Sequence, residues 1–558
     1  MPPLENSPSP GPAAAAALAA GFLALTLFVA SRSTLWDRDE PRFARASSEM
    51  AASGSFLVPT FGGAVRPDKP ILVYWLQVVA LRTLGPRELA FRFWSAAAAA
   101  GAGLATWAIG RTLFSSGVGV RAMAIFLTTP LLLLEAGAAT ADALLLLFTT
   151  AAMLAVARMV RGPARPADFL LFFVSTALGL LAKGPVGLAI PLVSAGAVLA
   201  FGRSEVPSRG RVGAYVLLAS AAAVGAFLAW FVPADRASGG LLWTEGLGKH
   251  VLGRALHPME GHGGAALQSA PYYLPVVLLG FSPWVAYLPA AIRDLAGGRL
   301  GGRRGRLLLA AWIVPTLALF TAIATKLPHY VLPVFPALAL VAAAEIEAGA
   351  ASADPRARGD RAWRRAGAWI FAPIAVAETA GLVAGAFLLP SALRIGSAAL
   401  AAIVALSAGA VLLRLLRDDP RAAARAAFAG VVCAEILIGA IVLPAVETLK
   451  PVPFVARAIR SQLPAGVEVA TFDFAEPSLD FYLGGPAPRR LARADDVVRW
   501  SSRGAPGVLV TTRSGLASFP SAAALGLAEF ASRTGIDVAR GRWLELVALR
   551  RGAPPKAD

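Results

Sequence analysis

About thirteen apolar stretches of membrane-spanning length recur along the 558 residues, separated by short segments rich in glycine, proline and arginine. Each stretch approaches the roughly 20 residues that a helix needs to cross a bilayer. Hydrophobic residues make up 57% of the chain and charged residues 15%, which excludes an ordinary soluble enzyme and predicts a polytopic α-helical membrane protein. The stretches lie near residues 13–30, 89–110, 118–135, 143–160, 167–182, 185–201, 213–233, 271–291, 307–325, 330–346, 366–389, 394–413 and 423–444.

The arginines predict the orientation of these helices. With the N-terminus placed inside, six alternating connections carry clusters of arginine on the cytoplasmic side, as the positive-inside rule requires. The rule also accounts for most of the formal net charge of +18, so no nucleic-acid partner is expected. The segments predicted to lie outside include loop 31–88, loop 234–270 and the chain after about residue 445.

The first outer loop breaks this bias. Acids and guanidiniums alternate over residues 36–45, and further charges follow over residues 66–70. Charge at a membrane edge is costly unless it has a ligand. Arginine and lysine suit a phosphate, and carboxylates suit a metal or an incoming hydroxyl. One interpretation is a site where a phosphate-bearing lipid meets an acceptor. The other is a solvated loop with internal ion pairs.

Three acids are candidate catalytic groups. Asp39 and Glu40 open a predicted short helix over residues 41–53, and Asp142 opens an apolar helix with no other charge within several residues. Acids at helix starts also act as caps or offset the helix dipole, which is the alternative for each. Two outward acids at the ends of different helices suit the binding of an acceptor hydroxyl.

The outer side also carries the candidate ligands of a lipid phosphate, which needs two or three cations. The alternative for each is a solvated charge or one that snorkels to the interface. The candidates are Arg42, Arg45, Lys69, Lys183, Arg254 and Lys326, with Tyr330 as a nearby interfacial aromatic.

A metal site is a further hypothesis. Asp68, His250 and His262 fall on the outer side, and histidine with carboxylate suits Zn²⁺, whereas carboxylate suits Mg²⁺ or Mn²⁺. The sequence lacks tight His-x-x-x-His spacing, which argues against this hypothesis.

The composition changes near Pro451. Short strands are predicted over residues 466–473, 507–512 and 543–549, with helical patterns such as 521–532 between them. We therefore predict two domains: a transmembrane catalytic domain over residues 1–445 and a small periplasmic α/β domain over residues 446–558.

Four ordered motifs resemble a known family. They are Asp37-Arg-Asp-Glu-Pro-Arg-Phe-Ala44, Pro67-Asp-Lys-Pro-Ile-Leu-Val-Tyr-Trp-Leu76, Leu181-Ala-Lys-Gly-Pro-Val-Gly187 and Thr325-Lys-Leu-Pro-His-Tyr-Val-Leu-Pro333. Together they resemble the bacterial aminoarabinose transferases and their broader relatives, the protein O-mannosyltransferases. Both are polyprenyl-phosphate-sugar glycosyltransferases of the GT-C fold.

The resemblance implies an enzyme of the bacterial inner membrane that works as a monomer at the periplasmic face. It would transfer a sugar such as 4-amino-4-deoxy-L-arabinose from undecaprenyl phosphate to an acceptor, with inversion. Lipid A, another glycan and a protein all stay open as the acceptor. By motif, Asp39 and Asp142 match the family's aspartates. Arg42, Lys69 and Arg254 match family residues proposed to bind the carrier phosphate or a charged acceptor. Asp68 and His250 match family residues associated with a metal, and Tyr330 matches an aromatic residue near the carrier.

Two departures and two alternatives accompany this interpretation. Arg66 stands where the close relatives tend to carry an aromatic, and Asp68 shortens their glutamate, which leaves sugar and acceptor open. A lipid-linked-sugar transporter or flippase would place charges near mid-helix along a path. Here the candidates sit at outer helix ends. A scaffold presenting its C-terminal domain would leave the charged outer loop without a purpose.

Overall fold

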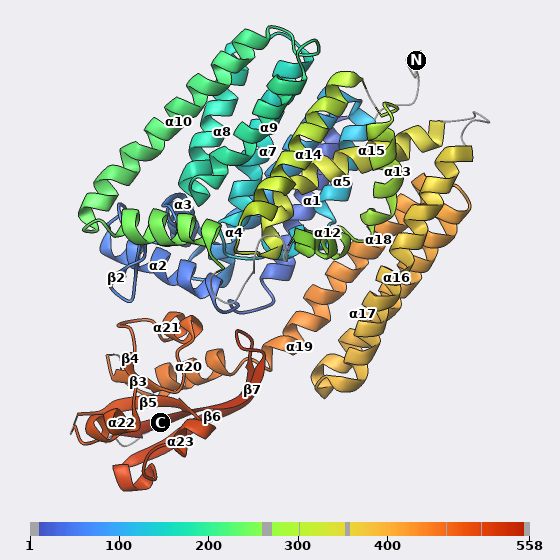
Figure 1. Cartoon of the computed structure of the whole chain (residues 1–558). Coiled ribbons are helices and arrows are strands. Elements are labelled where there is room, and N and C mark those ends of the chain that lie inside the picture. The colour runs from blue at the N-terminus through green and yellow to red at the C-terminus, as the bar shows by residue number, and fades with distance from the viewer. Residues whose placement is uncertain are drawn as a thin grey trace.

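A helical bundle and a small sheet domain make up the molecule. The computed structural model describes residues 11–258, 270–300, 302–351, 358–464, 466–503 and 505–551. Figure 1 shows the long helices packed side by side and the sheet domain, in red, hanging from one end of the bundle. The connection runs through α19 (Leu443–Glu447) and α20 (Pro451–Gln462).

Membrane-spanning segments dominate the described residues. Nine helices there are long and apolar enough to cross a bilayer, or up to eleven if two bent pairs each count as one span. This confirms the predicted polytopic helical class, while the count of thirteen stays a prediction. The spans involve α1 (Pro12–Ala30), α7 (Asp142–Arg161), α8 (Pro166–Lys183), α10 (Arg209–Ala237), α14 (Arg303–Ala322), η4 with α15 (Pro328–Val334, Phe335–Ala351), α16 (Arg358–Leu388), α17 (Ser391–Leu416), and α18, η6 and α19 (Pro420–Leu437, Ile438–Val442, Leu443–Glu447).

The two bent pairs break at prolines. Helix α5 (Ser116–Leu127) meets α6 (Pro130–Ala136) at 69°, and α12 (Tyr273–Gly280) meets the segment of η3 and α13 (Trp284–Tyr287, Leu288–Ala296) at 105°. Proline lacks an N–H and fixes its own φ, so it interrupts one helix and suits the first turn of the next. The short α6 therefore ends close to the start of α7, where Asp142 lies.

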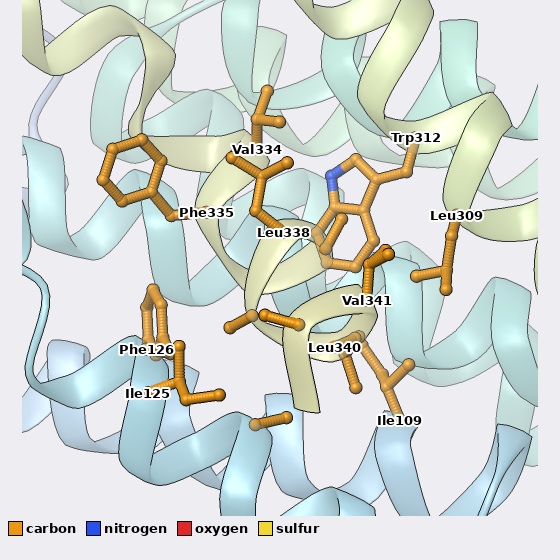
Figure 2. Close-up of a cluster of buried hydrophobic side chains, with 14 of the residues drawn as sticks. Ile109, Ile125, Phe126, Leu309, Trp312, Val334, Phe335, Leu338, Leu340 and Val341 are labelled. Carbon is orange, nitrogen blue, oxygen red and sulfur yellow. The ribbon is translucent and has the colours of Figure 1, made fainter. Parts of the chain in front are cut away.

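Apolar side chains hold the bundle together. Figure 2 shows one part of this core, in which Trp312 of α14 faces Leu338 and Val341 of α15. Trp312 is fully buried. Helix α4 (Glu88–Leu113) packs on α5 so closely that a Cβ added to Gly110 would lie 2.6 Å from the Cα of Gly119, so glycine is required there. Helix α9 (Val186–Phe201) completes the bundle beside α8.

The first outer loop is folded. It contains α2 (Asp39–Ser53), a hairpin of β1 (Thr60–Phe61) with β2 (Ala64–Val65), and α3 (Leu72–Leu84), so the short helix predicted over residues 41–53 is confirmed. A buried ion pair fixes α2 to the bundle: the guanidinium of Arg92 in α4 donates to both carboxylate oxygens of Glu40, at 2.8 and 2.6 Å. Glu40 also accepts from the backbone N–H of Ala139 at 2.7 Å.

Replacing Arg92 with methionine is expected to destabilise the protein by about 3–5 kcal/mol, because Glu40 would remain buried without its counter-charge. Thermal unfolding of the purified protein measures the loss. Glu40→Gln combined with Arg92→Met should recover part of it, since no unpaired charge remains. Arg87→Met, at the exposed start of the same helix, is the matched control. A melting temperature for Arg92→Met equal to that of the control contradicts the prediction.

The C-terminal domain is built on a five-stranded sheet of order β4-β3-β5-β7-β6. Its elements are β3 (Glu468–Phe472), α21 (Pro477–Leu483), β4 (Arg489–Leu491), α22 (Ala494–Ser501), β5 (Gly507–Thr512), α23 (Arg513–Leu516), η7 (Ala523–Leu525), β6 (Leu527–Asp537) and β7 (Arg542–Arg551). Strand β3 is parallel to β4 and β5, while β7 is antiparallel to β5 and β6. The three predicted strands and the α/β class are confirmed.

The predicted helical pattern over residues 521–532 is wrong. Only the short η7 forms there, and from Leu527 the chain enters β6. Strand β6 pairs antiparallel with β7 from Leu527 opposite Arg551 to Asp537 opposite Arg542. The first residues of β6 thus form backbone hydrogen bonds with the far end of β7. This pairing overrides the helical pattern in the local sequence.

The C-terminal domain forms hydrogen bonds and an ion pair with the segment that leads into α2. The backbone N–H of Leu35 donates to the hydroxyl of Tyr482 at 2.7 Å, and Arg38 pairs with Glu476 at 3.2 Å. The carboxylate of Asp37 accepts from the backbone N–H of Ser478 at 2.8 Å. Burial raises the pKa of Asp37 to about 6. The start of α2 is therefore held from the bundle side by Arg92 and from the outer side by this domain.

Candidate active site

A cavity of about 230 Å³ opens between the first outer loop and the ends of several helices. Its wall is largely apolar and aromatic, and its lysines, arginine and histidines come from separate elements. The lining includes Lys69 of the first loop, Lys183 of α8, Phe227, Trp230 and Phe231 of α10, His250 of η1 (Leu242–Gly253), Arg254 of α11 (Arg254–Leu256), Leu319 and Phe320 of α14, and His329 and Tyr330 of η4. An apolar wall with a few charged groups is typical of a ligand site.

Three predicted cations meet in this cavity: Lys69, Lys183 and Arg254. Burial lowers the pKa of Lys69 to about 8, and the positive charges of Lys183 and Arg254 act in the same direction. Like charges that lower one another's proton affinity create a positive potential, which an anion would relieve. The cavity therefore suits a phosphate with an apolar tail.

Asp142, at the first turn of α7, lies beside these cations. Its carboxylate pairs with the ammonium of Lys183, and that ammonium lies 5.2 Å from the ring centre of Tyr330. The Nε2 of His329 is 3.5 Å from Oδ1 of Asp142, and the Nδ1 of His329 is 3.6 Å from Oε1 of Glu135 in α6. Four elements thus bring two acids, a lysine and a histidine together.

Asp39, the other predicted aspartate, begins α2 and is open to solvent. Its side chain is 70% exposed, and its nearest cation is Arg42 at 4.0 Å. The negative charge of Asp39 nevertheless acts on Lys69, which places the carboxylate within electrostatic reach of the cavity. An exposed carboxylate beside a cationic cavity is free to meet an incoming substrate.

Asp68 and His250 come together as the metal hypothesis requires, with Nε2 of His250 3.2 Å from Oδ1 of Asp68. Arg66 pairs with the other carboxylate oxygen at 3.2 Å. Burial by itself would raise the pKa of Asp68, but the hydrogen bond from His250 and the charge of Arg66 outweigh it and hold the pKa below its usual range. A Cβ on Gly246 would lie 2.8 Å from the carbonyl of Pro67, so glycine allows η1 to approach this loop.

These residues alone do not make a metal site. A zinc site takes at least three protein ligands, and the described part of the chain holds no group of three suitable side chains. Both oxygens of Asp68 are already engaged by Arg66 and His250. His262 lies outside the described residues. The metal therefore stays a prediction.

Three predicted site residues make structural contacts and do not line the cavity. Glu40 is buried against Arg92 with both oxygens occupied, which favours a structural role over a catalytic one. Arg45 donates to Glu49 at 2.7 Å and to the carbonyl of Gly485, so it ties α2 to the C-terminal domain. The ammonium of Lys326 donates to carbonyls at the end of α14, including that of Phe320 at 3.1 Å. That contact caps the helix and leaves Lys326 only 2% exposed.

Two residues of the site were not among the predicted site residues. Glu135 appears in the sequence as one acid within an apolar stretch, and His329 as one residue of the fourth motif. Their proximity follows from the bend between α5 and α6, which no local pattern reports. The available signal was the rarity of acids in apolar helices, which marks such residues as functional candidates.

Parts of the chain are similar in sequence to known proteins. The family model described as dolichyl-phosphate-mannose-protein mannosyltransferase matches residues 68–230. The undecaprenyl phosphate-α-4-amino-4-deoxy-L-arabinose arabinosyl transferase of Edwardsiella ictaluri is 30% identical over 331 residues, 56% of each chain. The corresponding protein of Aeromonas salmonicida is 32% identical over 343 residues, 58% of each chain. The chain thus spans a little over half the length of the curated relatives it matches.

A comparison with a solved structure shows a similar fold over nearly the whole chain. The crystal structure of ArnT from Cupriavidus metallidurans bound to undecaprenyl phosphate has a TM-score of 0.74, with 20% identity, and covers 96% of this chain and 97% of that one. The fold and the cavity define a polytopic membrane protein of the GT-C type with a small C-terminal sheet domain. The resemblance to the aminoarabinose-transferase-like family is confirmed.

Proposed function

We propose that this protein is an integral-membrane glycosyltransferase that moves a sugar from undecaprenyl phosphate to an acceptor at the periplasmic face of the bacterial inner membrane. In this proposal the sugar is 4-amino-4-deoxy-L-arabinose, which the names of the curated relatives give as the sugar of their donor. The proposed acceptor is lipid A. The observation that carries the proposal is the cavity itself, in which Lys69, Lys183 and Arg254 line the same space as an apolar aromatic wall.

The geometry suggests how such a transfer would proceed. Lys69 and Arg254 bind the phosphate, while the polyprenyl chain lies along the aromatic wall of α10. The bond from the sugar to phosphate breaks as positive charge builds on the sugar ring, and the cations stabilise the leaving phosphate. Asp39 binds the acceptor from the open side, so attack comes from the face opposite the phosphate and the configuration inverts. A hydroxyl acceptor would also pass its proton to Asp39.

A second candidate is a protein O-glycosyltransferase of the mannosyltransferase type. It is supported by the family model that matches residues 68–230, whose description names a protein acceptor. The donor chemistry is the same in both candidates, so the cations keep the same task. A lipid-linked-sugar transporter is disfavoured, because the cations and acids of the cavity gather at one end of the bundle instead of forming a path through it.

Mass spectrometry of envelope lipids and envelope glycoproteins, from cells with and without the gene, tests the proposal and separates the two candidates. A pentosamine on lipid A that disappears with the gene supports the first candidate. A hexose lost from a protein supports the second. Unchanged lipids and glycoproteins, together with no transfer from undecaprenyl-phosphate sugars by the purified protein, contradict both. A reporter fused after Asp558 that works only in the cytoplasm would contradict the periplasmic placement.

Donor affinity is expected to fall as the pH rises through about 8. Before the donor binds, Lys69 holds its proton below that pKa and loses it above, so binding an anion at higher pH requires proton uptake. The donor KM should therefore rise with pH in the wild-type protein. Lys69→Arg should remove this rise, because a guanidinium stays charged throughout. Donor-dependence kinetics across this pH range are the measurement, and equal pH dependence in both proteins contradicts the assignment.

A further inference from the structure

His329 stands between carboxylates from two different helices. Its Nε2 faces Oδ1 of Asp142 at 3.5 Å, and its Nδ1 faces Oε1 of Glu135 at 3.6 Å. The hydroxyl of Thr140 donates to the other oxygen of Glu135 at 3.3 Å, which fixes that carboxyl. The histidine side chain is 22% exposed and lines the cavity, so this group borders the space where the donor would bind.

The two ring nitrogens of His329 cannot both donate to a carboxylate while the imidazole is neutral. A neutral imidazole has one N–H and one lone pair, so it can donate to only one of two flanking carboxylates. Its other nitrogen would then direct a lone pair at a carboxylate oxygen, which is repulsive. The contacts become favourable when the group carries one additional proton, either on the imidazole or on Glu135. The geometry therefore favours one additional proton on this group.

Other charges surround this group and share its electrostatics. The ammonium of Lys183 pairs with the same oxygen of Asp142 that faces His329. The ring of Tyr330 lies edge-on to His329, with 5.1 Å between ring centres. From the first loop, Lys69 and Asp39 act on His329 electrostatically. Any proton that leaves the group consequently changes the field at the phosphate site and at both aspartates.

We propose that Glu135, His329 and Asp142 form a proton-sharing array in which His329 positions the carboxylate of Asp142 for sugar transfer and Glu135 holds the imidazole. The proposal rests on the proposed glycosyltransferase function and assigns a positioning task to two further residues of the same site. Lys183 by itself holds Asp142 through a flexible side chain. The imidazole adds a rigid second contact, as the partners of other functional side chains do.

The array predicts a particular pH dependence. Below the pH at which the additional proton leaves, Asp142 is held in place. Above it, repulsion between the imidazole lone pair and a carboxylate loosens the contact, so kcat at saturating donor should fall. In Glu135→Gln, the amide N–H can donate to Nδ1 while a neutral imidazole donates from Nε2 to Asp142. This variant keeps the position of His329 without needing the proton.

Kinetics of wild type, His329→Asn and Glu135→Gln across neutral and alkaline pH test the array. His329→Asn should lower kcat by about ten- to a hundredfold, the usual cost of losing such a partner, while the donor KM stays near that of the wild type. Glu135→Gln should keep most of kcat at neutral pH and lose the alkaline fall. The exposed His257 of the same outer face provides the matched control, His257→Asn. An unchanged kcat in His329→Asn, or an alkaline fall that persists in Glu135→Gln, overturns the proposal.

A second measurement does not depend on turnover. In protein with isotopically labelled histidine, the ring signal missing from His329→Asn identifies His329. That signal should shift strongly between neutral and alkaline pH in the wild type, as the array loses its proton, and should shift much less in Glu135→Gln, where only the charge of Lys69 still changes. Identical titration in both proteins overturns the array even if the transfer reaction is established. A wild-type protein that transfers no sugar but shows this titration difference retains the array and contradicts the proposed function.

Discussion

Asp39→Asn is expected to lower sugar transfer by about 10²–10⁴-fold while the protein still inserts and folds, because the change removes a charge and hardly alters the shape. The side chain of Asp39 is 70% exposed and its nearest cation is Arg42 at 4.0 Å, so little of the fold depends on it. It stands at the first turn of α2, where its carboxylate can bind or deprotonate an acceptor.

Turnover with saturating donor and acceptor, on purified protein, measures this effect. Asp495→Asn, an exposed acid at the start of α22 on the C-terminal domain, is the matched control and should transfer normally. Asp142→Asn should resemble Asp39→Asn, since Asp142 adjoins Lys183 inside the site. Near wild-type turnover in both aspartate variants would show that the two carboxylates take no part in the chemistry.

Lys69→Ala and Arg254→Ala are each expected to weaken donor use by about ten- to a hundredfold, as the loss of one charge-assisted contact of roughly 1.5–3 kcal/mol implies. Both residues line the cavity, and the charge of Arg254 acts directly on Lys69. The donor KM should rise, and kcat should fall as well, because the negative charge on the leaving phosphate grows toward the transition state.

Lys249→Ala is the matched control for these variants. Lys249 lies on η1 close to Arg254 in sequence, but its side chain is 55% exposed and pairs with Glu245, so the donor KM should not change. Arg254→Lys should recover only part of the loss if the guanidinium binds the phosphate through two N–H groups. Unchanged donor kinetics in both alanine variants would contradict this assignment and would indicate that other cations of the outer face bind the phosphate.

The C-terminal domain takes part in the site through the first loop. Its contacts to Leu35, Asp37 and Arg38 end directly before Asp39. Burial raises the pKa of Asp37 to about 6, and the contact to Ser478 favours the ionised carboxylate. The domain therefore holds the chain in place directly before the start of α2. The sequence showed a separate α/β unit but contained no sign that it would hold this segment.

The sequence by itself determined the class of the protein and indicated three cations that line one cavity. Apolar length and composition fix a helical membrane protein, because a spanning helix satisfies its backbone hydrogen bonds locally and needs no distant partner. The charges that break the positive-inside bias could also be recognised in the sequence. Of the cations predicted on the outer side, Lys69, Lys183 and Arg254 line one cavity. Three of the strands were visible in the same way, as short runs of β-forming residues.

Only the tertiary structure decided which charges face the cavity. Glu40 and Arg45 stand among the same alternating charges as Asp39 and Arg42, yet partners distant in sequence, Arg92 and the carbonyl of Gly485, turn the first two toward structural contacts. The proximity of Glu135, His329 and Asp142 likewise arises from a helix bend and from packing between α6, α7 and η4, and strand β6 depends on pairing with β7. A sequence pattern reports periodicity and local propensity, whereas the partner of a buried charge is set by contacts across the fold.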